Sequence, residues 1–142
     1  MSYKKILVAV DNRENSIIVA KKGFELAEQM NAEIALIFVV DISKIMVTPN
    51  PDILFDDALE DLKKHTQDSL NDIILKNNRN KDTLKFMPQG FPRDCILNTA
   101  YDWDADLIVI GLHGKTGIGI FVMGSISQYI SIHSKIPVMI VP

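Results

Sequence analysis

The chain has 142 residues, of which 47% are hydrophobic and 23% are charged, and its formal net charge is −3. This balance is typical of an ordinary globular protein, so intrinsic disorder of the whole chain is excluded. The length suits one domain with a single core, and a mildly acidic chain lacks the concentrated basic face of a general nucleic-acid binder. We therefore expect one domain over residues 1–142 that does not bind nucleic acid.

The sequence shows no sign of a membrane span or of an export signal. Its longest apolar runs are at residues 6–10, 34–40 and 107–112, far short of the roughly 18 residues that cross a bilayer. The basic N-terminus is followed by too few apolar residues for a secretory signal. Cys95 is the only cysteine, which excludes an internal disulfide and a cysteine metal cluster. We expect a cytoplasmic protein without a membrane partner.

The first part of the chain predicts a strand, a helix and a second strand. Residues 6–10 form a continuous, partly β-branched apolar run, which is typical of a strand covered on both faces. In the polar turn that follows, Asn15 or Ser16 is placed to cap a helix. Asn31 ends this helix, and residues 34–40 predict a second buried strand. The apolar face of the helix is formed by Ile17, Ala20, Phe24 and Ala27.

The middle of the chain predicts a loop, a long helix and a third strand. Residues 41–51 are expected to form a loop, because Pro49 and Pro51 prevent regular structure. A helical pattern runs from about residue 53 to residue 77. Residues 83–87 predict a more polar strand, which suits a sheet edge. The apolar stripe of the long helix consists of Leu59, Leu62, Thr66, Leu70 and Ile73.

The last third predicts a short helix, a strand, a further helix and a final strand. The short helix follows the turn at residues 90–92, the fourth strand covers residues 106–110, and the fifth covers residues 137–141. Another helix is expected to begin near Ser125. The apolar positions of the short helix are Ile96, Ala100 and Trp103. Those of the later helix are Ile126, Tyr129, Ile130 and His133.

Strands and helices therefore alternate along the whole chain. This alternation implies parallel strand pairing with right-handed crossovers. The predicted fold class is α/β: a single-domain, open five-stranded parallel sheet that is doubly wound, with helices on both faces. In such sheets, ligands bind beyond the carboxyl ends of the strands, where the strand order reverses.

The segment that follows the fourth strand is the candidate ligand site. It holds five of the seven glycines within residues 111–125, and glycine lets backbone N–H groups approach an anion closely. The helix expected near Ser125 would favour phosphate at its N-terminus. Neither a Walker A loop nor a dinucleotide fingerprint is present, because Val109 and Val122 stand where each motif needs glycine.

The spacing Gly-x2-Gly-x9-Gly-Ser is formed by Gly111, Gly114, Gly124 and Ser125. With this spacing, the chain closely resembles the nucleotide-binding branch of the universal stress protein family. The resemblance covers essentially the whole chain, and its other matching segments are residues 6–11, 90–92, 106–111 and 137–141. It implies the strand order 3-2-1-4-5 and a fold like that of the adenine nucleotide alpha hydrolases.

The resemblance also implies a site for ATP with Mg²⁺ or Mn²⁺. Asp11 and the backbone of Val40 would lie near adenine and ribose. Gly111 and Gly114 would line the path of the ribose and phosphates, and Lys115 would add positive charge. The phosphate-facing amides and hydroxyls would come from Gly124, Ser125, Ile126 and Ser127.

Several residues leave alternatives open. Where the family often has Asp-Gly-Ser, this chain has Asp11-Asn12-Arg13, so Arg13 either contacts phosphate or lies in solvent. Ser125 could cap a helix as well as contact a ligand. His113 has no carboxylate next to it in sequence that would orient it as a general base, and Cys95 is more simply a small buried hydrophobe than a reactive thiol.

The leading hypothesis is a nucleotide-binding regulatory protein that acts as a homodimer in the stress response. The resemblance implies that the C-terminal strand pairs with a second copy, which would cover an apolar sheet edge. Nucleotide binding would then shift the protein between two states without chemistry. The alternatives are a slow ATPase or adenylyl-transferring relative, for which no nucleophile–base pair is evident, and a dimeric interaction module without a nucleotide.

Overall fold

The computed structural model describes residues 3–46, 54–112 and 123–142 of the chain. Its strands are β1 (Lys5–Ala9), β2 (Glu33–Ile37), β3 (Val40–Asp41), β4 (Leu84–Phe86), β5 (Gln89–Gly90), β6 (Leu107–Gly111) and β7 (Val138–Val141). Its helices are α1 (Asn15–Met30), α2 (Ser43–Met46), α3 (Phe55–Lys76), α4 (Pro92–Asp102) and α5 (Ser125–His133).

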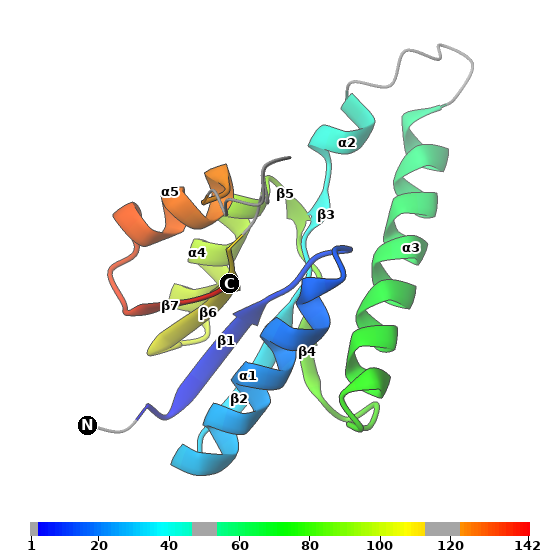
Figure 1. Cartoon of the computed structure of the whole chain (residues 1–142). Helices are drawn as coiled ribbons and strands as arrows, with labels where there is room; N and C mark the ends of the chain where they lie inside the picture. Colours follow the sequence, from blue (N-terminus) through cyan, green and yellow to red (C-terminus); the bar gives the residue numbers. More distant parts are fainter. Residues whose placement is uncertain (1–2, 47–53, 113–122) are drawn as a thin grey trace, which may run out of the picture.

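The main sheet has five strands in the order β4-β2-β1-β6-β7, and every neighbouring pair is parallel (Figure 1). Counting these five strands in chain order gives 3-2-1-4-5, so the predicted fold class and strand order are confirmed. The order reverses between β1 and β6, because the chain moves outward to β2 and β4 on one side and to β7 on the other. This position is the topological switch point of a doubly wound sheet.

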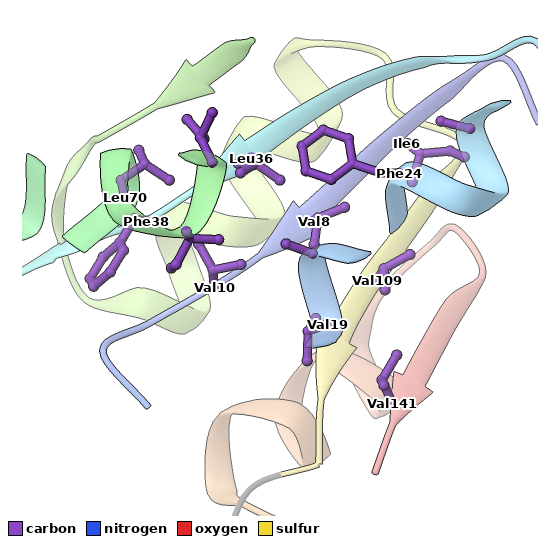
Figure 2. Close-up of a cluster of buried hydrophobic side chains, with 14 of the residues drawn as sticks. Ile6, Val8, Val10, Val19, Phe24, Leu36, Phe38, Leu70, Val109 and Val141 are labelled. Atoms are coloured by element: carbon purple, nitrogen blue, oxygen red, sulfur yellow. The ribbon is translucent and has the colours of Figure 1, made fainter. Parts of the chain in front are cut away.

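The sheet is covered on both faces, and β1 shows why its sequence is continuously apolar. Successive strand residues point to opposite faces. Ile6 and Val8 therefore pack into one core with α1 and α3, while Leu7 and Ala9 pack into the other with α4 and α5. Figure 2 shows the first of these cores, where Ile6, Val8 and Phe24 lie together over the sheet.

Helix α1 lies very close to the sheet, and Gly23 makes this possible. A Cβ atom at this position would be 2.4 Å from Cγ2 of Val8, which is fully buried. The helix is ended by Asn31, as predicted, in a left-handed conformation with φ 53°.

The end of the second predicted strand differs from the prediction. In the main sheet the strand stops at Ile37, and Val40–Asp41 pairs with Gln89–Gly90 in a separate two-stranded sheet. Pro88 separates β4 from β5, and it has no N–H group with which to continue the ladder. The apolar run at residues 34–40 therefore spans two short pairings rather than one strand.

Three local predictions were also wrong. Ser43–Met46 forms a helical turn within the predicted loop at residues 41–51, and residues 47–53 lie outside the described residues. Neither Asn15 nor Ser16 caps α1, since both lie in its first turn and Glu14 is the N-cap residue. Trp103 stands at the C-cap of α4 rather than within the helix. In the described part of the chain, no helix combines the length and apolar character needed to cross a membrane.

Candidate functional site

A pocket of about 140 Å³ opens at the carboxyl ends of β1, β2 and β6, at the point where the strand order reverses. Its walls are mainly apolar and include Ile37, Phe38, Val39, Ile96, Ile110 and Ile126. Its polar lining residues are Asp11, Asn12, Arg13, Asp41 and Lys44. Pockets that enclose a whole small ligand have volumes of roughly 300–1,000 Å³, so this pocket is suited to enclose one part of a larger ligand.

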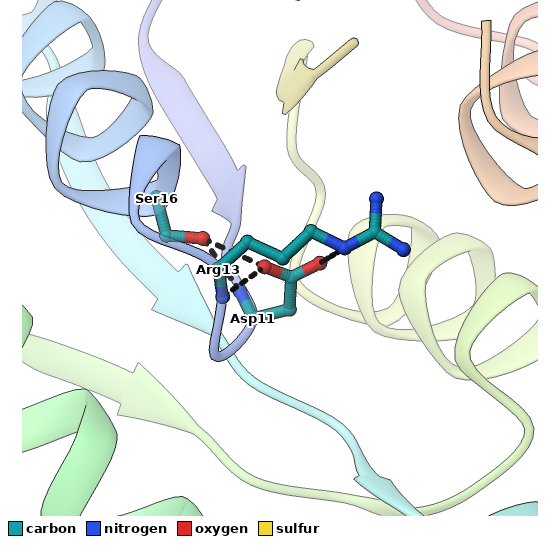
Figure 3. A network of polar contacts seen from close by, with 3 residues as sticks. All are labelled: Asp11, Arg13 and Ser16. Carbon is teal, nitrogen blue, oxygen red and sulfur yellow. Dashed lines mark hydrogen bonds and ion pairs between the residues drawn. The ribbon is translucent and has the colours of Figure 1, made fainter. Parts of the chain in front are cut away.

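The turn between β1 and α1 holds the carboxylate of Asp11 in a network of polar contacts (Figure 3). Its Oδ1 accepts hydrogen bonds from the backbone N–H of Arg13 at 2.9 Å and from the hydroxyl of Ser16 at 3.0 Å. The Ser16 Oγ in turn accepts from the N–H of Asp11 at 2.9 Å. Because Ser16 is only 2% exposed, this network ties the pocket carboxylate to a rigid part of the fold.

Arg13 lies alongside the same carboxylate. Its Nε is 3.8 Å from Oδ2 of Asp11, and the side chains of Arg13 and Asp11 are 55% and 32% exposed. In Figure 3, the Arg13 side chain passes the carboxylate and carries its guanidinium away from Ser16. Arg13 also lines the pocket. The sequence left open whether Arg13 lies near a ligand, and the structure places it at the pocket.

Asp41 of β3 and Lys44 of α2 line another side of the pocket. Asp41 accepts two hydrogen bonds at its Oδ1, from the N–H of Ser43 at 3.1 Å and from its hydroxyl at 2.6 Å. These bonds fix the first turn of α2, which brings Lys44 to the pocket. The predicted loop is therefore replaced here by a short ordered element.

The first turn of α5 lies on a further side of the pocket, which it lines through Ile126. Gly124 is the N-cap residue, with φ −69° and ψ 159°, and Ser125 is the first helical residue. Because glycine has no side chain, no cap oxygen accepts a hydrogen bond from the first-turn N–H groups. Ser127 is fully buried, and its hydroxyl donates to the carbonyl of Gly124 at 3.0 Å. A helix start of this kind offers N–H groups and a positive dipole end to an anion.

The structure brings together several of the residues that the sequence singled out. Asp11 and Ile126 both line the pocket, although 115 positions separate them in the chain. Gly111 is buried at the end of β6, opposite Val141 of β7. Val40 is 1% exposed and does not line the pocket, whereas its neighbours Val39 and Asp41 do.

The other predicted site residues are bonded within the fold, lie outside the described residues, or do not line the pocket. The N–H of Val40 donates to the carbonyl of Pro88 at 2.8 Å, so its amide is already bonded within the fold. Gly114 and Lys115, together with His113, lie outside the described residues. Of the predicted α5 residues, Gly124, Ser125 and Ser127 belong to the helix start but are not among those that line the pocket.

Sequence reasoning did not single out Asp41, Lys44, Pro92 or Ile96 as site residues. A usable signal existed for two of them: Asp41 directly follows the second apolar run, and Pro92 is the first residue of α4, directly after residues 90–91 of the predicted turn. Carboxyl ends of parallel strands gather at one edge, so both positions fall near the site. Lys44 gave no signal, because its placement depends on the unexpected helical turn.

Cys95, the only cysteine of the chain, lies close to Gly90 and Asp41. Partial burial raises the pKa of Cys95 above its ordinary value, and the carboxylates of Asp94 and Asp41 raise it further. This shift favours the neutral thiol over the reactive thiolate. Cys95 is only partly buried, whereas the sequence predicted a buried hydrophobe. Within residues 3–46, 54–112 and 123–142, no group of three or more His, Cys, Asp or Glu side chains is arranged to hold a metal ion.

The fold and the pocket by themselves define the class of protein to which this chain belongs. The molecule is a doubly wound α/β protein with an apolar pocket, a fixed carboxylate and a glycine-capped helix start at its switch point. A sequence model described as the universal stress protein family matches residues 2–142. The chain belongs to the universal stress protein family.

Individual relatives agree with this assignment. The chain is 31% identical over 142 residues to a universal stress protein of Methanocaldococcus jannaschii, covering 98% of this chain and 82% of the relative. The structure of the universal stress protein UspA from Lactobacillus plantarum superposes with a TM-score of 0.81 at 22% identity, covering 100% of this chain and 99% of that one.

Two other solved structures contain a nucleotide. One is a universal stress protein in complex with cAMP, with a TM-score of 0.71, 21% identity and coverage of 100% and 99% of the two chains. The other is the universal stress protein from Archaeoglobus fulgidus in complex with dAMP, with a TM-score of 0.62, 21% identity and full coverage of both chains. At these identities the likeness shows the shared fold.

Proposed function

We propose that this protein binds an adenine nucleotide, ATP with a divalent cation, at the switch-point pocket and acts as a cytoplasmic regulator of the stress response. The observation that carries the proposal is the pocket itself, where apolar walls, the fixed carboxylate of Asp11 and the first turn of α5 meet. The cAMP and dAMP complexes of structurally similar proteins support an adenine nucleotide as the ligand.

Each part of a nucleotide has a matching part of the site. A flat base fits between apolar walls such as those formed by Phe38 and Ile96. The ribose hydroxyls are donors, and Asp11 offers them a carboxylate held in position by Ser16. The phosphates need several converging N–H donors, since one helix dipole contributes only about 0.3–1 kcal/mol. In this proposal Gly111, Gly114 and Lys115 complete the phosphate path from the segment after β6.

The metal ion would depend mainly on the nucleotide. Mg²⁺ often binds through one or two carboxylates together with substrate phosphates, and it keeps several waters. Asp11 fits the role of one such carboxylate, because it lines the pocket and is partly exposed. The ion would neutralise part of the phosphate charge.

We include in the proposal a homodimer formed through the C-terminal strand. Strand β7 is at the edge of the main sheet, where the described residues pair it with β6 alone. Met139, near its centre, is 37% exposed. An apolar edge of this kind is stabilised when a second copy adds its own strand. Nucleotide binding would then alter the surface that the dimer presents to a partner, provided that the two states differ in affinity.

The nucleotide proposal is tested first on freshly purified protein. Heat denaturation, chromatography and mass spectrometry should identify ATP at close to one molecule per chain. Release of ADP or AMP would instead favour hydrolysis. If no nucleotide is released and added ATP with Mg²⁺ does not bind, the proposed ligand is wrong. The result would then favour a dimeric interaction module that binds no nucleotide.

A variant then tests the placement of the phosphates. Gly124→Val adds a branched side chain at the start of α5 while keeping a backbone conformation that valine adopts readily. We expect ATP binding to weaken by at least about tenfold, or roughly 1.4 kcal/mol. Gly124→Ala is the matched control, because alanine is smaller than valine and brings no oxygen that would occupy the first-turn N–H groups. An unchanged dissociation constant in folded Gly124→Val would place the phosphates elsewhere.

A truncation tests the dimer. Removal of residues 138–142 takes away β7 and should give monomers or aggregates in sedimentation experiments. An intact, well-folded dimer after this truncation would show that another surface holds the two copies together.

A further inference from the structure

Arg13 is the site feature that the family resemblance does not account for. It occupies a position where the family often has serine, and it brings a positive charge to the lining of the pocket. Its side chain remains 55% exposed, so its position is not explained by a need to fill the core. The positive charge of Arg13 beside Asp11 therefore calls for a functional explanation.

The ion pair between Arg13 and Asp11 is weak in its geometry. A single nitrogen, Nε, lies 3.8 Å from one carboxylate oxygen, instead of the two parallel hydrogen bonds that arginine forms with carboxylates at closer range. Exposed pairs of this kind usually contribute little to stability. Among the residues that the structure describes, Asp11 is the one ion-pair partner of Arg13. An anionic ligand would therefore displace little when it engages the guanidinium.

The carboxylate does not depend on this arginine side chain for its position. Asp11 is held through Oδ1 by the Arg13 backbone N–H and by the buried Ser16 hydroxyl. The Arg13 side chain can thus turn toward a ligand while Asp11 stays in place. Arginine is also well matched to this task, because its planar guanidinium binds phosphate oxygens in a bidentate manner.

We propose that Arg13 is a specificity-determining residue of the nucleotide site, which exchanges its contact with Asp11 for a phosphate group of the ligand. The site would thereby favour phosphate-bearing nucleotides over the corresponding nucleoside. This inference rests on the proposed nucleotide function, and it names the ligand group that one residue of this chain selects.

The experiment compares ATP, AMP and adenosine by calorimetric titration of the full-length protein. Replacing Arg13 by glutamine removes the charge and keeps a similar side-chain length. We expect Arg13→Gln to weaken ATP binding by about tenfold and adenosine binding by less than about twofold. Arg13→Lys should recover part of the ATP affinity, because it restores charge without the bidentate fork. The effect should shrink at high salt, since the guanidinium is partly exposed.

A matched control removes the same charge elsewhere. Lys21 is exposed on α1 and does not line the pocket. Lys21→Gln changes the net charge of the protein by the same amount, so it measures the general electrostatic attraction of a nucleotide. Equal losses of ATP affinity in Lys21→Gln and Arg13→Gln would overturn the inference.

A second background separates a direct role from a role in positioning Asp11. In Asp11→Asn protein the carboxylate that pairs with Arg13 is removed. If Arg13 contacts phosphate, the change to glutamine in this background still lowers the affinity for ATP relative to that for adenosine. If Arg13 acts only through Asp11, that ratio stays constant, and the inference is wrong.

The outcomes also distinguish this inference from the proposed function. Wild-type protein that binds ATP, together with an Arg13→Gln variant whose ratio of ATP to adenosine affinity is unchanged, contradicts the role of Arg13 and leaves nucleotide binding intact. Wild-type protein that binds none of the three ligands overturns the proposed function, and with it this inference.

Discussion

The two ends of the sheet carry hollows of different size and chemistry. At the amino ends of the strands, a broad hollow of about 810 Å³ lies between the end of α1, the start of β2 and residues 78–84. At the carboxyl ends, the pocket measures about 140 Å³. The smaller one is the candidate site because of the residues that line it, and not because of its volume.

The two ends of the sheet differ in what their charged groups contact. In the larger hollow, Arg79 lies over the ring of Phe24 at 4.6 Å and forms an ion pair with Glu28, joining α1 to the end of α3. At the same end, the carboxylate of Asp106 accepts from the backbone N–H groups of Lys4 and Lys5. These contacts hold chain segments together. At the carboxyl end, by contrast, polar groups from several elements face one apolar pocket.

The largest expected effect comes from a substitution in β5, the strand that pairs with the pocket residue Asp41. Gly90 has φ 152°, a conformation that other residues adopt only with strain, and a Cβ atom there would lie 2.7 Å from Sγ of Cys95. We expect Gly90→Ala to lower the free energy of unfolding by about 2 kcal/mol and to weaken ATP binding, because β5 supports Asp41. Chemical denaturation and ATP titration measure the two effects.

A double variant provides the control for this prediction. Gly90→Ala with Cys95→Ala removes the close contact with sulfur and leaves the backbone strain. Stability should then recover only in part. Complete recovery would mean that the steric contact alone explains the effect, and no loss in the single variant would contradict the strained backbone.

The next effect belongs to the amino end and should leave the site untouched. Asp106→Ala removes the acceptor of two N–H groups, at 2.8 Å from Lys4 and 3.1 Å from Lys5. We expect a loss of about 1–2 kcal/mol of stability, with ATP affinity unchanged because Asp106 is at the opposite end of β6 from the pocket. Asp106→Asn keeps one acceptor oxygen and should lose less. A changed ATP affinity in Asp106→Ala would show that the two ends are coupled.

Much of the fold could be predicted because its strands carry a strong local signal. Strand β1 is buried on both faces, so residues 6–10 are apolar without interruption. The elements that were missed depend on distant partners instead. Strand β3 exists only because Val40 and Asp41 meet Gln89 and Gly90, nearly fifty positions away, and no local periodicity encodes such a pairing.

The candidate site was predictable to a different degree in each of its parts. Asp11 was proposed from the family resemblance, and its place directly after the first apolar strand agrees with a position at the switch point. The position of Lys44 follows from the helical turn that Asp41 and Ser43 fix, which the prolines at positions 49 and 51 obscured. For Arg13, the sequence indicated a departure from the family pattern, but its contact with Asp11 required coordinates.

A smaller effect is expected in the larger hollow. Arg79→Met keeps an unbranched side chain over Phe24 and removes the ion pair with Glu28. We expect a loss of less than about 1 kcal/mol, since the side chains involved are partly exposed. Chemical denaturation measures this loss, and ATP titration should show no change. A larger loss of stability would mean that the ion pair with Glu28 contributes more than exposed pairs usually do. Weaker ATP binding would mean that the larger hollow is coupled to the candidate site.

The smallest effect concerns the reactivity of a single thiol. The raised pKa of Cys95 leaves less thiolate at a given pH, and the thiolate is the form that alkylating reagents attack. The alkylation rate of the folded protein should therefore rise at a higher pH than that of the denatured chain. Because Asp41 contributes to the shift, Asp41→Asn should move the rate profile to lower pH. Mass spectrometry after timed alkylation measures these rates. A profile that is unchanged in Asp41→Asn would mean that the Asp41 carboxylate has no influence on Cys95, and that the pairing of β3 with β5 holds the two side chains less closely than the structure shows.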